Sequence, residues 1–140
     1  MAATLQVEIV SAEKAIFSGE ATLVSASAQM GEVGIAPGHT PFITRIKPGE
    51  IRVATAGDDA DLDVYVSGGL MEVQPYEVTI LADTVMRADD IDESAAEKAR
   101  EEAEAALAGK AGEIDYAAVQ QQLAEASAQL QLIKKLRSNT

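Results

Sequence analysis

Apolar and polar residues alternate with a period of two in short segments throughout the first 86 residues of the chain. Residues 5–10 show the alternation, and residues 51–55 and 63–67 repeat it on either side of the turn-forming segment 57–61. Because successive side chains of a strand point to opposite faces, these segments predict β-strands, and the last two predict a hairpin. Further strands are expected over residues 22–28, 42–47, 70–73 and 77–81.

Glycine and proline separate these segments, since glycine permits a positive φ and proline removes a backbone donor. Breaks are predicted at Gly19, Lys47-Pro48-Gly49, Gly68-Gly69 and Gln74-Pro75. Short strands at this spacing indicate an antiparallel β-sandwich or a flattened barrel. The segment 31–41 holds three glycines, two prolines and the only histidine, which predicts a rigid loop used for recognition.

The remaining residues, 87–140, have no proline and keep only two of the ten glycines, so a second domain is predicted after a first domain of residues 1–86. Two helices with a break at residues 108–112 are expected. A capping-box pattern starts the first helix at Asp90 to Glu93, and Asp115 can cap the second. The expected apolar faces are Ala95, Ala99, Ala103, Ala106 and Leu107 on the first helix, and Tyr116, Val119, Leu123, Ala126, Leu130 and Ile133 on the second.

The first of these helices presents alanine where larger apolar residues could lie. Replacing a buried leucine by alanine typically costs about 2–5 kcal/mol, so such a face holds its partner weakly. Alanine also has the highest helix propensity, so the helix can persist without that contact. Two interpretations stay open: the small residues permit close packing, or they allow the helix to detach and dock elsewhere.

Charge is unevenly distributed along this acidic chain, whose net charge is −12. Residues 87–125 carry eleven acids and four bases, whereas the last fifteen residues carry Lys134, Lys135 and Arg137 and no acid. The acidic balance argues against nucleic-acid binding. The basic end either complements the helix dipole or binds an acidic surface on a partner.

Residues for catalysis or metal binding are scarce, because the chain has one histidine and no cysteine. No phosphate-binding glycine motif is present, and the acidic run from Asp58 to Asp63 lacks the central glycine and distal glutamate of a calcium loop. We therefore expect no catalytic residue, no metal and no cofactor. Neither a signal peptide nor an apolar run long enough to span a bilayer is evident, so we expect no membrane insertion by the chain itself.

Several strings, in this order, closely resemble the epsilon subunits of bacterial F-type ATP synthases. They are Val10-Ser11-Ala12-Glu13, Phe17-Ser18-Gly19, the segment 31–41, Ile46-Lys47-Pro48-Gly49, the segment 67–73 and Leu81-Ala82-Asp83-Thr84. The resemblance covers the entire chain. It implies a ten-stranded β-sandwich followed by an antiparallel two-helix hairpin, in a non-catalytic subunit that joins the gamma subunit to the membrane c-ring and inhibits ATP hydrolysis.

The resemblance also implies roles for particular residues. Ser11, His39 and Thr44 match positions that face gamma, and Gly31 and Glu32 match positions at the c-ring. The hairpin would fold on itself or extend into the catalytic alpha and beta subunits. In the extended state the inhibitory contacts would come from Leu123, Leu130, Ile133, Lys134, Lys135 and Arg137.

One departure from the family concerns nucleotide binding. Some bacterial members bind ATP through a motif [IL]-D-x-x-R-A, where this chain has Ile91-Asp92-Glu93-Ser94-Ala95-Ala96, so Ala95 replaces the arginine and ATP binding is doubtful. The resemblance places the protein at the cytoplasmic face of the bacterial inner membrane, attached only through the complex. Two alternatives remain: a β-adaptor that dimerises through its second helix, and a carbohydrate- or metal-binding sandwich enzyme.

Overall fold

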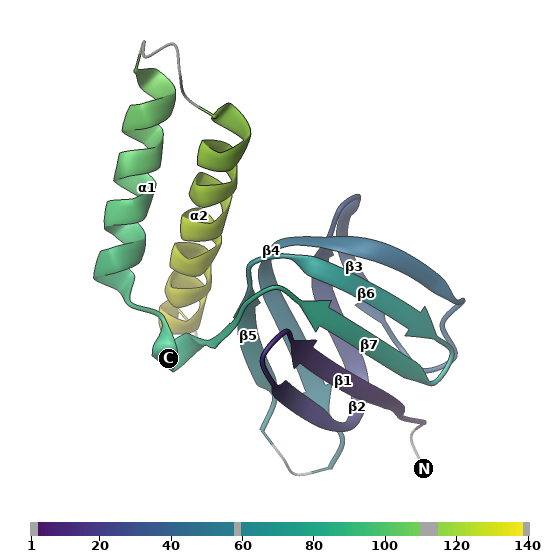
Figure 1. The fold of residues 1–140 in the computed structure, drawn as a ribbon. Coiled ribbons are helices and arrows are strands. Elements are labelled where there is room, and N and C mark those ends of the chain that lie inside the picture. Colours follow the sequence, from purple (N-terminus) through teal and green to yellow (C-terminus); the bar gives the residue numbers. More distant parts are fainter. Residues whose placement is uncertain (1–2, 58–59, 110–114, 139–140) are drawn as a thin grey trace. The chain divides into compact units, whose positions relative to one another are not determined.

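The computed structural model describes residues 3–57, 60–109 and 115–138 (Figure 1). The chain forms two compact units, Met1–Arg87 and Ala88–Thr140. The described part of the first unit contains eight strands. They are β1 (Leu5–Ser11), β2 (Ala15–Ala28), β3 (Gly31–Ile35), β4 (Phe42–Thr55), β5 (Leu62–Val66), β6 (Gly69–Gln74), β7 (Glu77–Ala82) and β8 (Val85–Arg87).

The strands form two layers that share the long strands β2 and β4. One layer has the order β2-β1-β7-β6-β4, in which β1 and β7 are parallel and the other pairs antiparallel. The other has the order β3-β2-β4-β5-β8. The predicted sandwich is confirmed, but the described residues contain eight strands and not the expected ten, because β2 and β4 each run through both layers.

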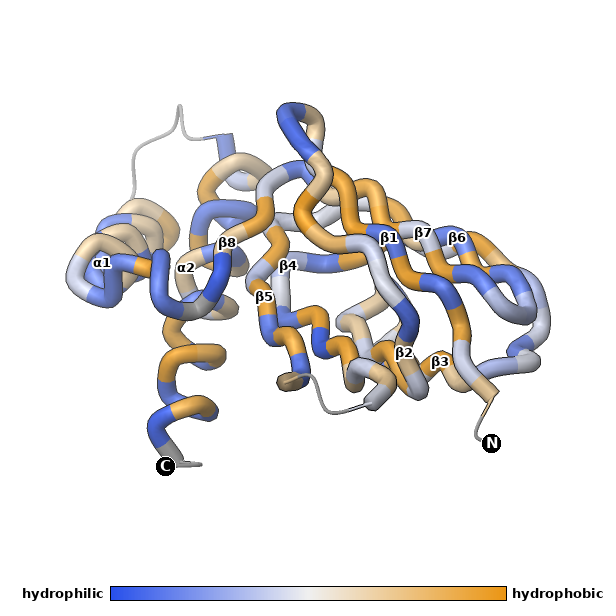
Figure 2. The backbone as a smooth tube through the Cα atoms, turned by 90° about the horizontal axis from the view of Figure 1, so that it is seen from below, coloured by the Kyte–Doolittle hydropathy of each residue, from blue (hydrophilic) through white to orange (hydrophobic). Residues whose placement is uncertain are grey.

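The core of the sandwich lies between these layers and comes from the inward positions of the alternating strands. Val7 and Ile9 on β1, Ile80 on β7 and Met71 on β6 have no exposed side-chain surface. Figure 2 shows hydrophobic and hydrophilic residues alternating along these strands. The period-two pattern of the sequence therefore identified the buried face correctly, and the hairpin of β4 and β5 pairs as expected.

The expected loop over residues 31–41 is wrong in its first half, because Gly31–Ile35 forms β3 and pairs with β2. Val33 is half-buried and Ile35 fully buried, whereas Glu32 and Gly34 are exposed. This period-two burial stabilises a strand despite the two glycines. The segment without regular strand structure is limited to residues 36–41, and its Gly38 N–H donates to the Pro75 carbonyl at 2.6 Å.

Two expected breaks, at Gly19 and at Lys47-Pro48-Gly49, are also wrong, since β2 and β4 run through them. The ring of Phe17 covers Gly19, where an added Cβ would lie 3.1 Å away. Pro48 lies at a bulge, because Ala26 pairs with Ile51 but Ala28 pairs with Ile46. A proline is tolerated at such a bulge because the ladder is interrupted there.

The breaks at Gly68-Gly69 and Gln74-Pro75 are confirmed, and the first of them requires glycine. Gly69 has φ of 152°, and a Cβ there would lie 2.3 Å from the Leu81 carbonyl oxygen. Both the positive φ and the approach of the neighbouring backbone exclude a side chain.

The second unit is an antiparallel helical hairpin of α1 (Glu93–Ala108) and α2 (Tyr116–Ser138), preceded by a 3-10 turn, Ala88–Asp90. The N-cap of α1 is Asp92, whose carboxylate accepts from Ala95 N at 3.1 Å, so the capping box on Asp90 is wrong. Asp115 caps α2 as predicted, accepting from Ala118 N at 3.2 Å. The helix α1 ends at Ala108 inside the predicted break, of which residues 110–112 lie outside the described part.

The apolar face of α1 agrees with the expected one at Ala103 but not at the two positions before it. Ala103 is buried as predicted, whereas Ala95 and Ala99 are exposed and the neighbouring Ala96 is buried. The remaining expected positions, Ala106 and Leu107 on α1 and Val119, Leu123, Leu130 and Ile133 on α2, are half-buried. Ala126 is buried as predicted, Tyr116 is 54% exposed, and the buried Leu132 was missed. Small side chains thus occupy the most buried positions of α1.

Replacing Gly69 with alanine is expected to lower the free energy of unfolding by at least about 2 kcal/mol, since the new Cβ meets backbone atoms of β7 at a positive φ. Gly34→Ala is the matched control, because the nearest atom to its Cβ, Leu23 Cδ1, is 3.9 Å away. Denaturant unfolding monitored by circular dichroism measures both. Equal stability of the two variants would contradict the strand packing described.

Candidate functional site

The outward face of the β2-β1-β7-β6-β4 layer carries a strip of apolar side chains. Val10 on β1 pairs with Leu81 on β7, which in turn pairs with Leu70 on β6. Leu70 is 40% and Leu81 52% exposed, and Ile43 on β4, in the adjacent row, is 64% exposed. We call Val10, Ile43, Leu70 and Leu81 the apolar strip. Scattered exposed apolar residues are ordinary, but contiguous ones mark an interaction surface.

The three residues expected to face gamma lie around this strip and not in one cluster. Ser11 follows Val10 at the end of β1, is half-buried and accepts from Lys14 N at 3.4 Å through its hydroxyl. Thr44 follows Ile43 and pairs with Met71, whose side chain is fully buried, so Thr44 lies on the inward side of the layer. Hence Ile43 provides the exposed surface beside Thr44, whereas Val10 is half-buried like Ser11.

His39 lies in the segment between β3 and β4, at the opposite end of the layer from Ser11. Its ring contacts the ring of Phe42, with the centroids 5.4 Å apart, and its Nδ1 lies 2.8 Å from the Thr40 carbonyl oxygen. Phe42 pairs with Val73, at the opposite end of β6 from Gly69. The predicted gamma residues are therefore distributed along the full length of the layer.

The residues expected at the c-ring lie at the tip of the β2–β3 hairpin. Gly31, with φ of 126°, begins β3 directly after the two-residue turn Gln29-Met30, and the exposed Glu32 pairs with Ser27. The Gln29 N–H donates to the Arg45 carbonyl at 3.0 Å, which ties the tip to β4. Met30 is 95% exposed. Met30 was not among the predicted site residues, although a large apolar residue in a two-residue turn was a visible signal.

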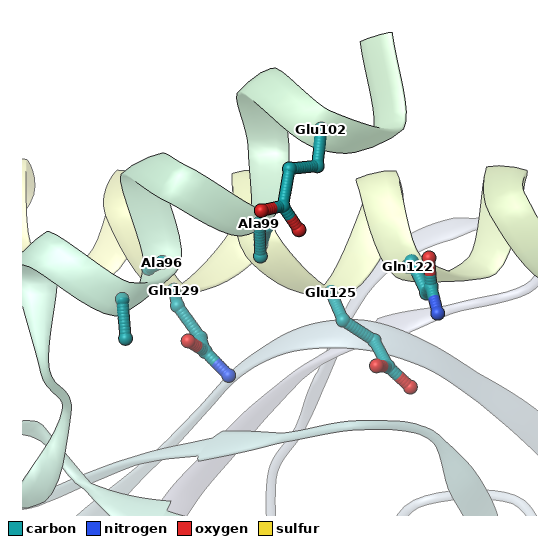
Figure 3. A pocket seen from close by; sticks show the side chains of 8 residues that line it. Ala96, Ala99, Glu102, Gln122, Glu125 and Gln129 are labelled. Atoms are coloured by element: carbon teal, nitrogen blue, oxygen red, sulfur yellow. The ribbon is translucent and has the colours of Figure 1, made fainter. Parts of the chain in front are cut away.

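A groove of about 280 Å³ runs between α1 and α2 at the position of the nucleotide motif. Figure 3 shows the side chains around it, with the alanines on α1 leaving it open. The lining residues are Ala95, Ala96, Ala99, Glu102, Gln122, Glu125, Ala126 and Gln129. Two carboxylates, two amides and no cation line the groove.

These residues do not fit a nucleotide. A triphosphate needs cationic or N–H donors directed at its oxygens, and the two glutamates instead repel it. Ala95, at the place of the motif arginine, contributes only its methyl group to the groove.

The residues expected to inhibit are distributed along α2 from Leu123 to Arg137. Leu123, Leu130 and Ile133 are half-buried, and Lys134 and Lys135 are exposed. Arg137 forms a bidentate ion pair with Glu93 in the first turn of α1, in which Nη1 donates to Oε1 at 3.0 Å and Nη2 donates to Oε2. The basic end of α2 is thus partly engaged within the hairpin.

Other kinds of site find little support in the described part of the chain. No group of three or more histidine, cysteine, aspartate or glutamate side chains there is arranged to hold a metal ion. Within residues 3–57, 60–109 and 115–138, no helix combines the length and apolar character needed to cross a membrane.

Comparison with known proteins gives the same division of the chain. The beta-sandwich domain of ATP synthase delta/epsilon chains matches residues 4–88. The long alpha-helix domain of the same chains matches residues 89–134. The chain is 56% identical over 136 residues to the ATP synthase epsilon chain of Xanthomonas euvesicatoria pv. vesicatoria, covering 97% of this chain and 96% of that protein. It is 53% identical over 134 residues to the epsilon chain of Halorhodospira halophila, covering 96% and 95%.

Solved structures show the same fold at lower identity. A chain of the Euglena gracilis mitochondrial ATP synthase OSCP/F1/c-ring assembly matches with a TM-score of 0.70 and 22% identity, over 98% of this chain and 81% of that chain. A chain of the Tetrahymena thermophila mitochondrial ATP synthase central stalk and c-ring matches with a TM-score of 0.57 and 15% identity, over 94% and 95%. Because the two matched domains together span residues 4–134, and relatives more than half identical cover nearly the full chain, this chain belongs to the ATP synthase delta/epsilon chain family.

Proposed function

We propose that this protein is the epsilon subunit of the central stalk of a bacterial F-type ATP synthase, and that its sandwich docks on the gamma subunit through the apolar strip. The strip supports this proposal because it combines exposed apolar side chains with a sheet whose core is fully buried. A rigid layer that presents apolar side chains loses little conformational entropy on binding. Ser11, His39 and Thr44 then lie at or near the margin of the gamma contact.

The tip of the β2–β3 hairpin would contact the c-ring. Glu32 is exposed there and can pair with a basic side chain of a c-subunit loop. The tip is supported by the backbone hydrogen bond between Gln29 and Arg45 and by the pairing of β2 with β3. Torque would pass from this tip through β2 into the layer that contacts gamma.

The helical hairpin would regulate the enzyme without chemistry of its own. In the extended state, α2 would insert between the alpha and beta subunits, and Leu123, Leu130 and Ile133 would exchange intramolecular contacts for intermolecular ones. Lys134, Lys135 and Arg137 would meet acidic segments there. The alanines buried on α1 favour this interpretation, since their contacts are individually weak.

The location follows from the assembly. The proposed subunit would lie at the cytoplasmic face of the bacterial inner membrane and be held there only by its protein partners, gamma and the c-ring.

Leu81→Glu is expected to weaken binding of the chain to gamma by about thirtyfold, because a carboxylate at the centre of the apolar strip would be desolvated on docking. Leu23→Glu is the control, since Leu23 is 41% exposed but lies on β2 where that strand pairs with β4 in the other layer. Titration calorimetry with purified gamma subunit measures both. Equal affinities of the two variants would refute docking through the strip.

Deleting residues 88–140 is expected to raise ATP hydrolysis by the assembled enzyme at least about twofold, the increase expected if half of the complexes are inhibited by an extended hairpin. The sandwich alone should still support assembly and proton pumping. Hydrolysis that does not rise would exclude the inhibitory role, and loss of proton pumping would show that the hairpin also takes part in coupling.

The isolated chain is expected to bind ATP very weakly or not at all, because Glu102 and Glu125 line the groove where the phosphates would lie. Titration calorimetry against ATP measures this directly. A clear binding isotherm at sub-millimolar ATP would contradict the interpretation of the groove.

A further inference from the structure

The ion pair between Glu93 and Arg137 closes one end of the helical hairpin. Glu93 lies in the first turn of α1 and Arg137 in the last turn of α2, 44 residues later. Both guanidinium Nη atoms donate to the carboxylate, one to each oxygen. In the antiparallel hairpin these turns lie opposite the connection between the helices (Figure 1). Two further polar pairs, Arg100 with Glu97 and Gln121 with Glu125, each lie within one helix.

Each partner also suits the helix end at which it lies. A carboxylate is stabilised near a helix N-terminus and a guanidinium near a C-terminus, so both dipoles favour the charges present. The rest of the contact is apolar, with Ala96, Ala103, Ala126 and Leu132 buried. The ion pair at the open end adds a polar link between the two helices that a single substitution can remove.

We propose that Glu93 acts as an internal substitute for the acidic surface that the basic end of α2 meets in the extended state, so that the pair latches the hairpin in its folded form. The inference rests on the proposed function. A guanidinium whose two Nη atoms donate to one carboxylate cannot donate the same two hydrogen bonds to a second carboxylate. Arg137 therefore pairs with Glu93 in the folded hairpin or with the partner in the extended one, and the two pairings compete.

The latch is weak enough to open. The side chains of Arg137 and Glu93 are 67% and 41% exposed, and pairs of this kind shift an equilibrium by about two- to fivefold. Since no cation lines the groove between the helices, the pair provides a means of biasing the hairpin that does not depend on nucleotide.

The competition predicts opposite results for two substitutions that break the same pair. Glu93→Gln releases Arg137 for the partner, so the ratio of extended to folded hairpins in the assembled enzyme should rise about two- to fivefold, and ATP hydrolysis should fall. Arg137→Gln removes the latch and the partner contact together, so hydrolysis should stay unchanged or rise. The matched control is Glu97→Gln, which removes a carboxylate that pairs within α1 and should leave hydrolysis unchanged. The proposal would be overturned if ATP hydrolysis fell equally in all three variants, or if it did not fall with Glu93→Gln.

The intact isolated chain separates the latch from the proposed function. Because the chain has no cysteine, spin labels can be placed at Lys98→Cys on α1 and Gln131→Cys on α2, both exposed. Electron–electron double resonance should show a short distance between the two labels. The fraction of molecules with that distance should fall with Glu93→Gln and with Arg137→Gln. In the double variant this fraction should fall no further than in either single variant, because both substitutions remove the same interaction. Raising the salt concentration from about 0.05 to about 0.5 M should lower the short-distance fraction appreciably only in the parent chain.

These two experiments fail in different ways. If Glu93→Gln and Arg137→Gln lowered the short-distance fraction independently and additively, the latch would be excluded, whatever the rate of ATP hydrolysis. A latch that holds in the isolated chain, combined with hydrolysis that is insensitive to deletion of residues 88–140, would instead reject the inhibitory function and with it the competition for Arg137.

Discussion

The sandwich depends on the continuity of β2 and β4 across both of its layers. Each strand pairs with one set of neighbours in its first half and with another in its second, and the two strands also pair with each other. This covalent connection closes the layers over one core and fixes the register of the outer strands. The register in turn places the side chains of the apolar strip on a single outward face.

The hairpin is built in the opposite way. Its two helices are individually well specified, by Asp92 and Asp115 as caps and by many alanines. The contact between them combines small buried side chains, larger apolar side chains that are mostly half-buried, and an exposed ion pair. Strong helices joined by a weak contact can separate without unfolding. The same chain thus combines a part suited to carrying torque with a part suited to changing partners, which is what a regulated rotor subunit requires.

The sequence alone predicted the buried faces of the strands and the two helices, because these follow from local periodicity. It failed where a neighbouring element decides the outcome. Pro48 does not end β4, because it lies at a bulge where the hydrogen-bond ladder is already interrupted. Gly19 does not end β2, and there the ring of Phe17 covers the glycine. The one-position error on α1 arose because Ala95 and Ala96 are chemically identical and only α2 distinguishes them.

The predicted site residues stay predictions, and the strand register adds what sequence spacing could not supply. The resemblance selected Thr44, which lies on the inward side of the layer, whereas its outward neighbour Ile43 is exposed. Likewise, Arg137 was predicted as a residue for a partner, and its contact with Glu93 depends on the antiparallel approach of two helices that sequence spacing does not specify.

Residue-resolved hydrogen exchange of the intact chain tests the central claim most directly, namely that a rigid sandwich carries a hairpin that opens independently. The account predicts that core amides of β1 and β7 exchange at least about 100-fold more slowly than amides in the middle of α1, because the two units open with different free energies. Equal protection of α1 and the sandwich core, lost together in a single cooperative unfolding event, would contradict it.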